Sequence, residues 1–449
     1  MDTRPLAASD TGFLGLSGYH WLVIAAGWAG WGFDVFDALL FNFVAPNAIP
    51  ALLHLTPGSA AAHTATVFWT GAVTSILLLS WAAGGVLFGW IADRIGRKRA
   101  LFATIALYAV GTGLCALVGS LWQLILCRTI SGLGIGGEWG IGAALVAEGV
   151  PENRRVAAGV IMQTSSPLGL LVATAVNYQI AGVWLVNHPQ SSWRFVFLAG
   201  FLPILVALAV RLFLRESSQW QQSRAHTEPS TPRELFTPGV RAATLSGFFV
   251  AVIAIVSWWG CNAFVPLLGS TLAHEHALDV GLAGAQAQHL AAAWQARASN
   301  AFNVGGLLGA LAALPLARVL GRRPMLIVYF LFSALAMFLT FGLALTPETR
   351  LTMLFTVGAG VFGVFGVFTF YLPELFPARL RATGAGFCYN VGRVLAAGGP
   401  FVVGVLSAAA GGSSTAIVRI LFWLALVPLT AALAARFLVV ETRGRPLPP

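Results

Sequence analysis

The chain has 449 residues, of which 57% are hydrophobic and only 9% are charged, and its mean hydropathy is +0.81. A soluble globular domain carries about 25% charged residues, so this composition excludes an ordinary water-soluble protein. The net charge of +10 is weak support for nucleic-acid binding, because no soluble basic domain exists to carry that role.

Apolar stretches of roughly 20 residues recur along the chain, and each is long enough to cross about 30 Å of hydrocarbon as a helix. Helices are expected because lipid leaves every backbone polar group to be satisfied within its own segment, and no alternating strand pattern is visible. The first stretch follows a polar lead without a basic region or a cleavage site, so we expect it to be retained. We predict an all-α membrane protein with twelve spans, at 19–45, 66–92, 101–119, 121–147, 155–181, 193–214, 241–268, 297–318, 324–345, 351–372, 382–409 and 416–440.

Basic residues gather in alternate connections between these spans. The other connections, near 46–65, 119–121, 182–192 and 269–296, hold almost none. By the positive-inside rule, both termini and the 215–240 segment are expected to face the cytoplasm, in a cell inner (plasma) membrane. The basic clusters are Arg94 to Arg99, Arg154 and Arg155, Arg211 to Arg241, Arg318 to Arg323, Arg379 and Arg381, and Arg436 to Arg445.

Three landmarks recur at nearly one offset and indicate a duplicated six-helix unit. Gly96-Arg97-Lys98 recurs as Gly321-Arg322-Arg323 after 225 residues, and Glu216 recurs as Glu441, also after 225. Glu148-x-x-Pro151-x-x-x-Arg155 recurs as Glu374-x-x-Pro377-x-x-x-Arg381 after 226. We predict two pseudo-symmetric bundles, 1–216 and 241–449, joined by a cytoplasmic linker at 217–240. Two such halves place a substrate site at their interface near mid-membrane.

These landmarks carry a family resemblance that covers essentially the whole chain. The run Gly85-x-x-x-Gly89-x-x-Ala92-Asp93-Arg94-x-Gly96-Arg97-Lys98 resembles the loop 2–3 signature of the major facilitator superfamily. Arg128-x-x-x-Gly132-x-Gly134, Pro373-Glu374-Leu375-Phe376-Pro377 and Glu441-Thr442-Arg443-Gly444 resemble sugar porters. Phe33-Asp34-Val35-Phe36-Asp37 and Gly136-Gly137-Glu138-Trp139 are more similar to the organic-acid/proton symporters.

Five charged residues lie well inside predicted spans, where each should be paired, hydrated or functional because insertion there costs about 2.5–3.5 kcal/mol. They are three acids and two bases, so internal pairing leaves one carboxyl group over, which low dielectric would favour in its protonated form. Such a group can exchange a proton near neutral pH. The five are Asp34, Asp37, Arg128, Glu138 and Arg393.

The resemblance to sugar porters implies that Asp37 faces Arg128 and that proton uptake breaks this pair; a permanent salt bridge is the alternative. Asp34 lies three residues before Asp37, on the same helix face. Glu138 could titrate or merely accept hydrogen bonds. Beside it, Gly132, Gly136 and Gly140 form a small-residue stripe for helix packing.

Arg393 has no obvious acidic partner, apart from Glu374 at a helix end. An unpaired guanidinium in a cavity suits a carboxylate, which it binds with two hydrogen bonds. Polar residues that could line the same cavity are Gln163, whose spacing resembles the substrate-binding glutamine of sugar porters, and Asn262, Asn300, Asn303, Tyr389 and Asn390.

The resemblance also implies a conformational latch at the cytoplasmic helix ends, which holds the two halves in one state. It would comprise Gly85, Gly89, Asp93, Arg94, Arg97, Glu148, Arg155, Glu374 and Arg381.

We expect no metal and no cofactor. His274-Glu275-His276 lacks the i, i+4 spacing of a zinc hydrolase and is predicted to lie in a solvated loop, and no phosphate-binding loop is present. The cysteines all fall inside predicted spans, without a disulfide pattern.

The sequence therefore predicts a non-enzymatic, monomeric, proton-coupled symporter of a small organic anion, a monocarboxylate or aromatic acid, that works by alternating access. The partners would be the substrate, protons and lipid, without nucleic acid. Sugar or polyol symport, drug efflux and a transporter-like receptor remain the alternatives.

Overall fold

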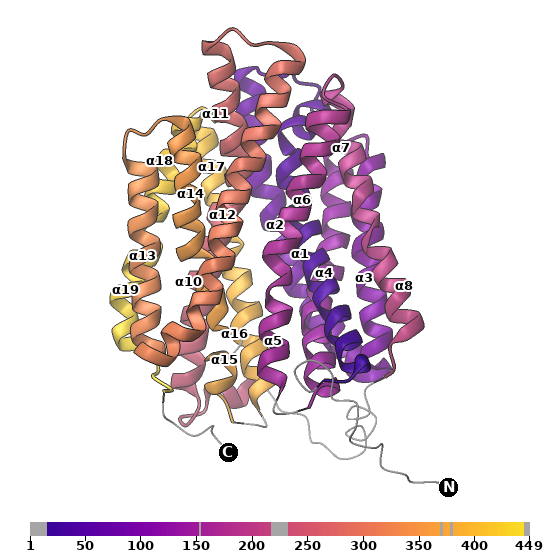
Figure 1. The fold of residues 1–449 in the computed structure, drawn as a ribbon, viewed down its shortest axis with the longest axis vertical. Coiled ribbons are helices and arrows are strands. Elements are labelled where there is room, and N and C mark those ends of the chain that lie inside the picture. The colour runs from indigo at the N-terminus through magenta and orange to yellow at the C-terminus, as the bar shows by residue number, and fades with distance from the viewer. Residues whose placement is uncertain (1–15, 152–153, 217–231, 369–370, 378–379, 444–449) are drawn as a thin grey trace.

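The computed structural model describes residues 16–151, 154–216, 232–368, 371–377 and 380–443, which are helical with no strand among them. An N-terminal and a C-terminal bundle stand side by side (Figure 1). The first contains α1 (Gly18–Leu52), α2 (Ala60–Ile95), α3 (Arg97–Leu114), α4 (Leu121–Gly149), α5 (Arg155–Gln163), α6 (Ser165–Asn177), α7 (Pro189–Leu198) and α8 (Pro203–Phe213). The second contains α10 (Arg241–Asn262), α11 (Val265–Asp279), α12 (Gly284–Leu320), α13 (Arg322–Gly342), α14 (Pro347–Val361), α15 (Tyr371–Glu374), α16 (Arg381–Ala396), α17 (Gly398–Ala409), α18 (Ser414–Leu424) and α19 (Leu426–Leu438).

Twelve helical crossings follow the predicted order. Eleven stretches of the described chain are long and apolar enough to cross a membrane. The remaining one is α4, which has 29 residues and carries Arg128 and Glu138. The fold is thus an all-α membrane protein of two pseudo-symmetric six-helix bundles, as the sequence predicts.

Five crossings consist of two consecutive helices, and in each the second helix has a proline in its first turn. Proline lacks the N–H that would bond to the preceding turn, so it interrupts a helix interior but is accommodated at a helix start. The breaks between α5 and α6, α7 and α8, α10 and α11, α16 and α17, and α18 and α19 are followed by Pro167, Pro203, Pro266, Pro400 and Pro428 respectively.

Several helices extend beyond the predicted spans. Helix α1 continues to Leu52 through Pro46 and Pro50, and α12 begins at Gly284, well before the predicted residue 297. The predicted loop at His274-Glu275-His276 is wrong, because these residues belong to the last turns of α11. Hydropathy marks only the apolar part of a helix, so polar extensions beyond it escape a hydropathy-based prediction.

The small-residue stripe of α4 packs closely against α2. A Cβ atom added to Gly136 would lie 2.0 Å from the backbone oxygen of Trp81, and one added to Gly132 would lie 2.1 Å from Ser80 Oγ. Only glycine fits at such an approach. Gly140, by contrast, would meet nothing within 4 Å, so the packing prediction holds for the first two glycines and not for the third.

The same turn occurs in both bundles, at Gly96 before α3 and at Gly321 before α13. Both glycines have positive φ, 100° and 93°, a region that glycine enters without steric cost. The carboxylate of Glu216 accepts the N–H of Arg97 at 2.7 Å, and that of Glu441 accepts the N–H of Arg322 at 3.0 Å. The two halves therefore share local geometry as well as sequence landmarks. We call the end of the molecule with these turns the basic end.

The two bundles touch along α2 and α17 and along α6 and α12. A Cβ atom on Gly71 of α2 would lie 2.4 Å from the backbone oxygen of Pro400 and 3.0 Å from Gly404 Cα. Helices from different bundles are therefore in direct backbone contact at this point.

Candidate functional site

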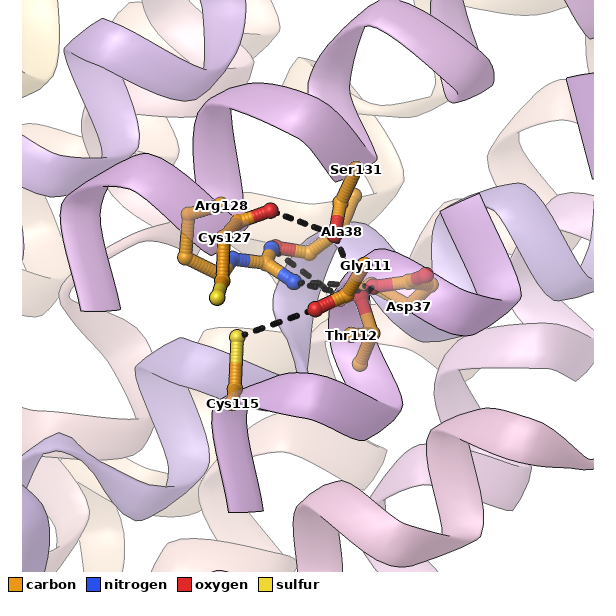
Figure 2. Close-up of polar contacts among 8 residues, drawn as sticks. All are labelled: Asp37, Ala38, Gly111, Thr112, Cys115, Cys127, Arg128 and Ser131. Carbon is orange, nitrogen blue, oxygen red and sulfur yellow. Dashed lines mark hydrogen bonds and ion pairs between the residues drawn. The ribbon is translucent and has the colours of Figure 1, made fainter. Parts of the chain in front are cut away.

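Asp37 and Arg128 form a fully buried ion pair between α1 and α4. Arg128 Nη1 lies 2.8 Å from Asp37 Oδ1, and both side chains are 0% exposed. Arg128 Nη2 donates to the backbone oxygens of Asp37 at 3.1 Å and Ala38 at 2.8 Å. Thr112 of α3 donates to the same Asp37 oxygen and lies 2.9 Å from Ser131 Oγ (Figure 2). The contact predicted for Asp37 and Arg128 is thus present.

The network leaves Asp37 Oδ2 without a hydrogen bond among the described residues. Because Oδ1 already receives Arg128 and Thr112, Oδ2 is the atom to which a proton could add without displacing an existing donor. Protonation would cancel the charge that holds Arg128.

Asp34 and Glu138 form a second acidic site, between the same two helices. Both are 0% exposed, and none of their four carboxyl oxygens has a hydrogen-bond partner in the described part of the chain. A Cβ atom on Gly30, one turn before Asp34, would lie 2.0 Å from Glu138 Oε1. The Glu138 carboxyl group therefore occupies a niche on α1 that only glycine leaves open, near enough to Asp34 for the two to interact electrostatically.

Arg393 of α16 lies at the interface of the two bundles and is only 3% exposed. Its guanidinium carbon is 4.3 Å from the ring centroid of Trp81, on α2 of the other bundle, and 4.7 Å from that of Tyr389. Nη1 donates to Asn390 Oδ1 at 3.2 Å, whereas Nε has no hydrogen-bond partner among the residues that the structure describes. No described carboxylate forms an ion pair with it, so Arg393 is a buried cation held between aromatic faces.

Aromatic rings continue from Trp81 into the C-terminal bundle. Trp81 contacts Trp259 of α10 with centroids 5.9 Å apart, and Trp259 contacts Trp258 at 4.8 Å. Trp258 packs on Phe362 at 5.4 Å and on Phe365 at 5.6 Å. These rings form an apolar wall next to Arg393.

Buried hydrogen-bond donors that have no partner in the described part of the chain gather on the same helices. They share burial and an unused N–H group, and native structures rarely leave such groups unsatisfied unless a ligand or water serves them. They are Trp81 Nε1, Trp258 Nε1, Asn262 Nδ2 and Arg393 Nε.

Comparison with known proteins decides the family. The chain is 32% identical over 420 residues to the "Probable 4-methylmuconolactone transporter" of Cupriavidus pinatubonensis, covering 93% of this chain and 90% of that protein. It is also 25% identical to the gentisate transporter of Corynebacterium glutamicum, covering 88% and 83%. The family model described as "Sugar (and other) transporter" matches residues 45–239.

The chain belongs to the major facilitator superfamily. Its fold agrees with the partially occluded, inward-open xylose transporter XylE of E. coli, with a TM-score of 0.73 at 20% identity, covering 96% of this chain and 100% of that one. It is therefore a multi-pass membrane transporter of small molecules and not an enzyme.

Within this major facilitator fold, the predicted cavity-lining amides separate into two groups. Asn262 and Asn303 are buried, and each keeps one polar atom without a partner. Gln163 is half-buried at the end of α5. Asn300 is exposed on the side of α12 that also exposes Val304 and Leu311, so this residue faces lipid and its prediction as a lining residue is wrong.

The predicted latch is only partly described. Glu374 accepts Arg322 Nε at 2.9 Å and Nη2 at 2.5 Å, within its own bundle, so it is not the partner of Arg393. Arg94 lies over Trp90 at 3.7 Å, and the N–H of Arg97 is held by Glu216. A Cβ atom on Gly89 would meet nothing, whereas one on Gly85 would lie 3.2 Å from Asn390 Oδ1 across the interface. The side chains of Asp93, Glu148, Arg155 and Arg381, and linker residues 217–231, lie outside the described residues.

Sequence reasoning missed a polar bridge between the bundles at the end opposite to the basic end. Gln295 of α12 donates to the backbone oxygen of Phe43 at 2.8 Å and accepts from Asn177 Nδ2 at 2.9 Å. Gln295 is 4% exposed. Gln295 lies in the polar part of α12 that was predicted to be a loop. It is spaced by four residues from Ser299 and eight from Asn303, so the three share one helix face. This pattern could be recognised only if the helix were predicted to begin before residue 297.

Proposed function

We propose that this transporter is a proton-coupled symporter of a small organic anion, a monocarboxylate or aromatic acid, that works by alternating access. The observation that carries the proposal is Arg393, a buried guanidinium at the bundle interface with no ionic partner among the described carboxylates. Asp34 acts on this guanidinium electrostatically but forms no direct ion pair with it. A buried charge without a directly bonded counter-ion is costly, and a substrate carboxylate would supply that contact.

The groups around Arg393 support an anionic, partly aromatic substrate over a sugar. Unused donors outnumber unused acceptors on α2, α10 and α16, which suits a carboxylate because it only accepts hydrogen bonds. The rings of Trp81, Trp258 and Trp259 offer faces and edges on which an aromatic ring could stack. The similar proteins reported above are a probable 4-methylmuconolactone transporter and a gentisate transporter, which supports an organic acid as the substrate.

Proton coupling is assigned to the acidic residues of α1 and α4. Asp37 would take a proton on Oδ2 and release Arg128, and the Asp34–Glu138 pair would carry the further proton that two neighbouring buried carboxyl groups favour. With Arg128 and Arg393 counted, the described buried set has three acids and two bases, so the two protons of this scheme together with one bound monocarboxylate make it neutral. We propose that this neutral form is the one that changes between inward and outward states.

Orientation and assembly remain part of the same proposal. The positive-inside rule assigns the basic clusters at the Gly96 and Gly321 turns to the cytoplasm, together with both termini. The protein would lie in the inner membrane as a monomer. The Gln295 bridge then closes the pathway on the periplasmic side, while the latch residues act on the cytoplasmic side.

A binding screen tests the substrate class. Purified protein is heated in the presence of benzoate, gentisate, nicotinate and lactate, and separately in the presence of xylose and glucose. A ligand that binds only the folded form raises the unfolding temperature, so we expect a carboxylate and no sugar to do so. A shift with sugars alone would reject the organic-anion assignment. Uptake of the hit into proteoliposomes, unchanged by a protonophore, would reject the proton coupling.

A further inference from the structure

A cavity of about 620 Å³ lies at the end of the molecule opposite to the basic end, apart from Arg393. The end of α1, the start of α2, α7, α11 and α12 contribute to its wall. It is large enough for a small organic molecule, since ligand pockets begin at about 300 Å³.

The charged and titratable residues of this wall are all basic. His54, His63 and His274 line it together with Arg194, and none of the described residues of the wall is an aspartate or a glutamate. The nearest acid on a lining helix, Glu275, is engaged elsewhere, because it accepts the N–H of Ser414 at 3.0 Å and the Ser414 hydroxyl. The histidines do not form a metal site with other described ligands.

His54 occupies a backbone position that normally belongs to glycine. Its φ is +54°, and every other described residue with positive φ is a glycine. The N–H of Leu55 bonds to the oxygen of Pro50 at 2.9 Å and that of His54 to Ala51 at 3.4 Å, the bond pattern of a Schellman helix end. Positive φ is sterically less favourable for histidine than for glycine. The histidine at this position places an imidazole in the cavity wall.

Arg194 is a fixed cation at the same wall. Its Nη1 donates to the backbone oxygens of Ala116 at 2.7 Å and Val118 at 2.8 Å, and its guanidinium lies 4.3 Å from the centroid of Trp193. It has no ion pair with a described carboxylate. These neutral contacts orient the guanidinium without cancelling its charge.

The cavity leads toward the bridge between the bundles. A narrower space shares Asn47, Ser270, His274 and Gln288 with the cavity and is also lined by Gln295. An ion held above this bridge would be the first to enter when Gln295 releases Phe43 and Asn177.

We propose that the cavity is an outer binding site for a small carboxylate anion, held by Arg194 with His54, His63 and His274 as hydrogen-bond donors, before the Gln295 bridge opens. The inference rests on the proposed function for its ligand class, but it concerns a site that is separate from Arg393.

The test measures which charge the cavity admits. A cysteine is introduced at Asn47, deep in the cavity, and in a matched control at Gln286, which is exposed on α12 and outside the lining. Protein in nanodiscs is treated with an anionic or a cationic methanethiosulfonate reagent, and labelling of the unsubstituted protein is subtracted. A cleft of one charge sign raises local counter-ion concentration by about tenfold or more, so the anionic-to-cationic rate ratio should be about tenfold higher in Asn47→Cys than in Gln286→Cys.

Two further variants separate charge from structure. Adding Arg194→Gln should lower the ratio toward that of the control, and Arg194→Lys should preserve it. Benzoate should slow labelling at Asn47→Cys and leave Gln286→Cys unchanged. If Asn47→Cys does not fold, Thr56→Cys at the cavity wall replaces it.

Equal rate ratios at the two positions, or labelling that benzoate does not slow, would overturn the proposal. Since no transport is measured, a failure of proton coupling or of Arg393 binding leaves this readout intact, and the two failures can be told apart.

Discussion

Replacing Asp37 by asparagine should destabilise the protein, and removing the Arg128 charge at the same time should recover most of the loss. Asp37→Asn keeps the shape of the side chain and an oxygen for Thr112, but it leaves the Arg128 cation fully buried without its ion-pair partner. Breaking a buried pair in this way costs about 3–5 kcal/mol.

The structure narrows that range. Arg128 would keep Thr112 Oγ1 and the backbone oxygens of Asp37 and Ala38 as acceptors, so we expect the lower end, about 3 kcal/mol. In Arg128→Gln the remaining carboxyl group can take up a proton, so the cost should be smaller, about 1–3 kcal/mol. The double variant Asp37→Asn/Arg128→Gln buries no charge at this place, which gives an interaction energy of about 2–3 kcal/mol.

Thermal unfolding of the purified variants in detergent measures this cycle. A unit of 150–250 residues shifts by about 2–4 °C per kcal/mol, so Asp37→Asn should unfold about 6–12 °C below the parent. If the two single losses simply add in the double variant, the ion pair has no energetic weight and the reasoning from its geometry is refuted.

Three further results are expected. Arg393→Gln should weaken carboxylate binding roughly 10- to 150-fold, as the loss of a charged hydrogen bond implies. Arg393→Lys should keep part of the affinity of the parent. Equal affinity of the parent and both variants in isothermal titration calorimetry would contradict the assignment. Gly136→Ala should destabilise by about 1–3 kcal/mol through overlap with a backbone oxygen, whereas Gly140→Ala, with open space around it, should be neutral in the same melting assay. Burial of Glu441 raises its pKa, but backbone N–H groups that bond to its carboxylate outweigh this effect and lower the pKa from 4.5. The stabilisation by Glu441 is therefore complete above about pH 4.5 and is lost as the pH falls below it. The unfolding temperature of Glu441→Gln should thus depend less on pH on the acid side than that of the parent, and an unchanged dependence would count against this helix-end contact.

Much of the fold follows from the sequence because few physical constraints suffice for it. Lipid requires helices of about 20 apolar residues, and the spacing of the arginines and the repeated glycine turns separates them into two similar bundles. The composition of the spans does not predict where each helix ends. The first span was predicted to end at residue 45, yet α1 continues through Pro46 and Pro50 to Leu52, because a membrane protein can satisfy the freed backbone groups by other means.

The sequence predicted the contact between charged residues, but it did not predict the contacts that depend on how the helices pack against one another. Asp37 and Arg128 were expected to meet because the resemblance to sugar porters pairs them. The position of Trp81 beneath Arg393 depends on the crossing of α2 and α16, which no single helix encodes. Asn300 shows the converse, since a polar residue within a span faced lipid and not the cleft.

Coupling between the proton gradient and the substrate is the central claim, and its equilibrium slope tests it most directly. Proteoliposomes are loaded with a carboxylate that passes the binding screen, the membrane potential is clamped to zero, and the internal-to-external substrate ratio is measured at several imposed pH gradients, with protein-free liposomes subtracted. Each coupled proton multiplies this ratio by about ten per pH unit. The account predicts a tenfold or larger rise per unit for the parent and a smaller rise for Asp37→Asn, which keeps only the Asp34–Glu138 pair, whereas equal slopes for the two proteins, or a flat line for the parent, would contradict it.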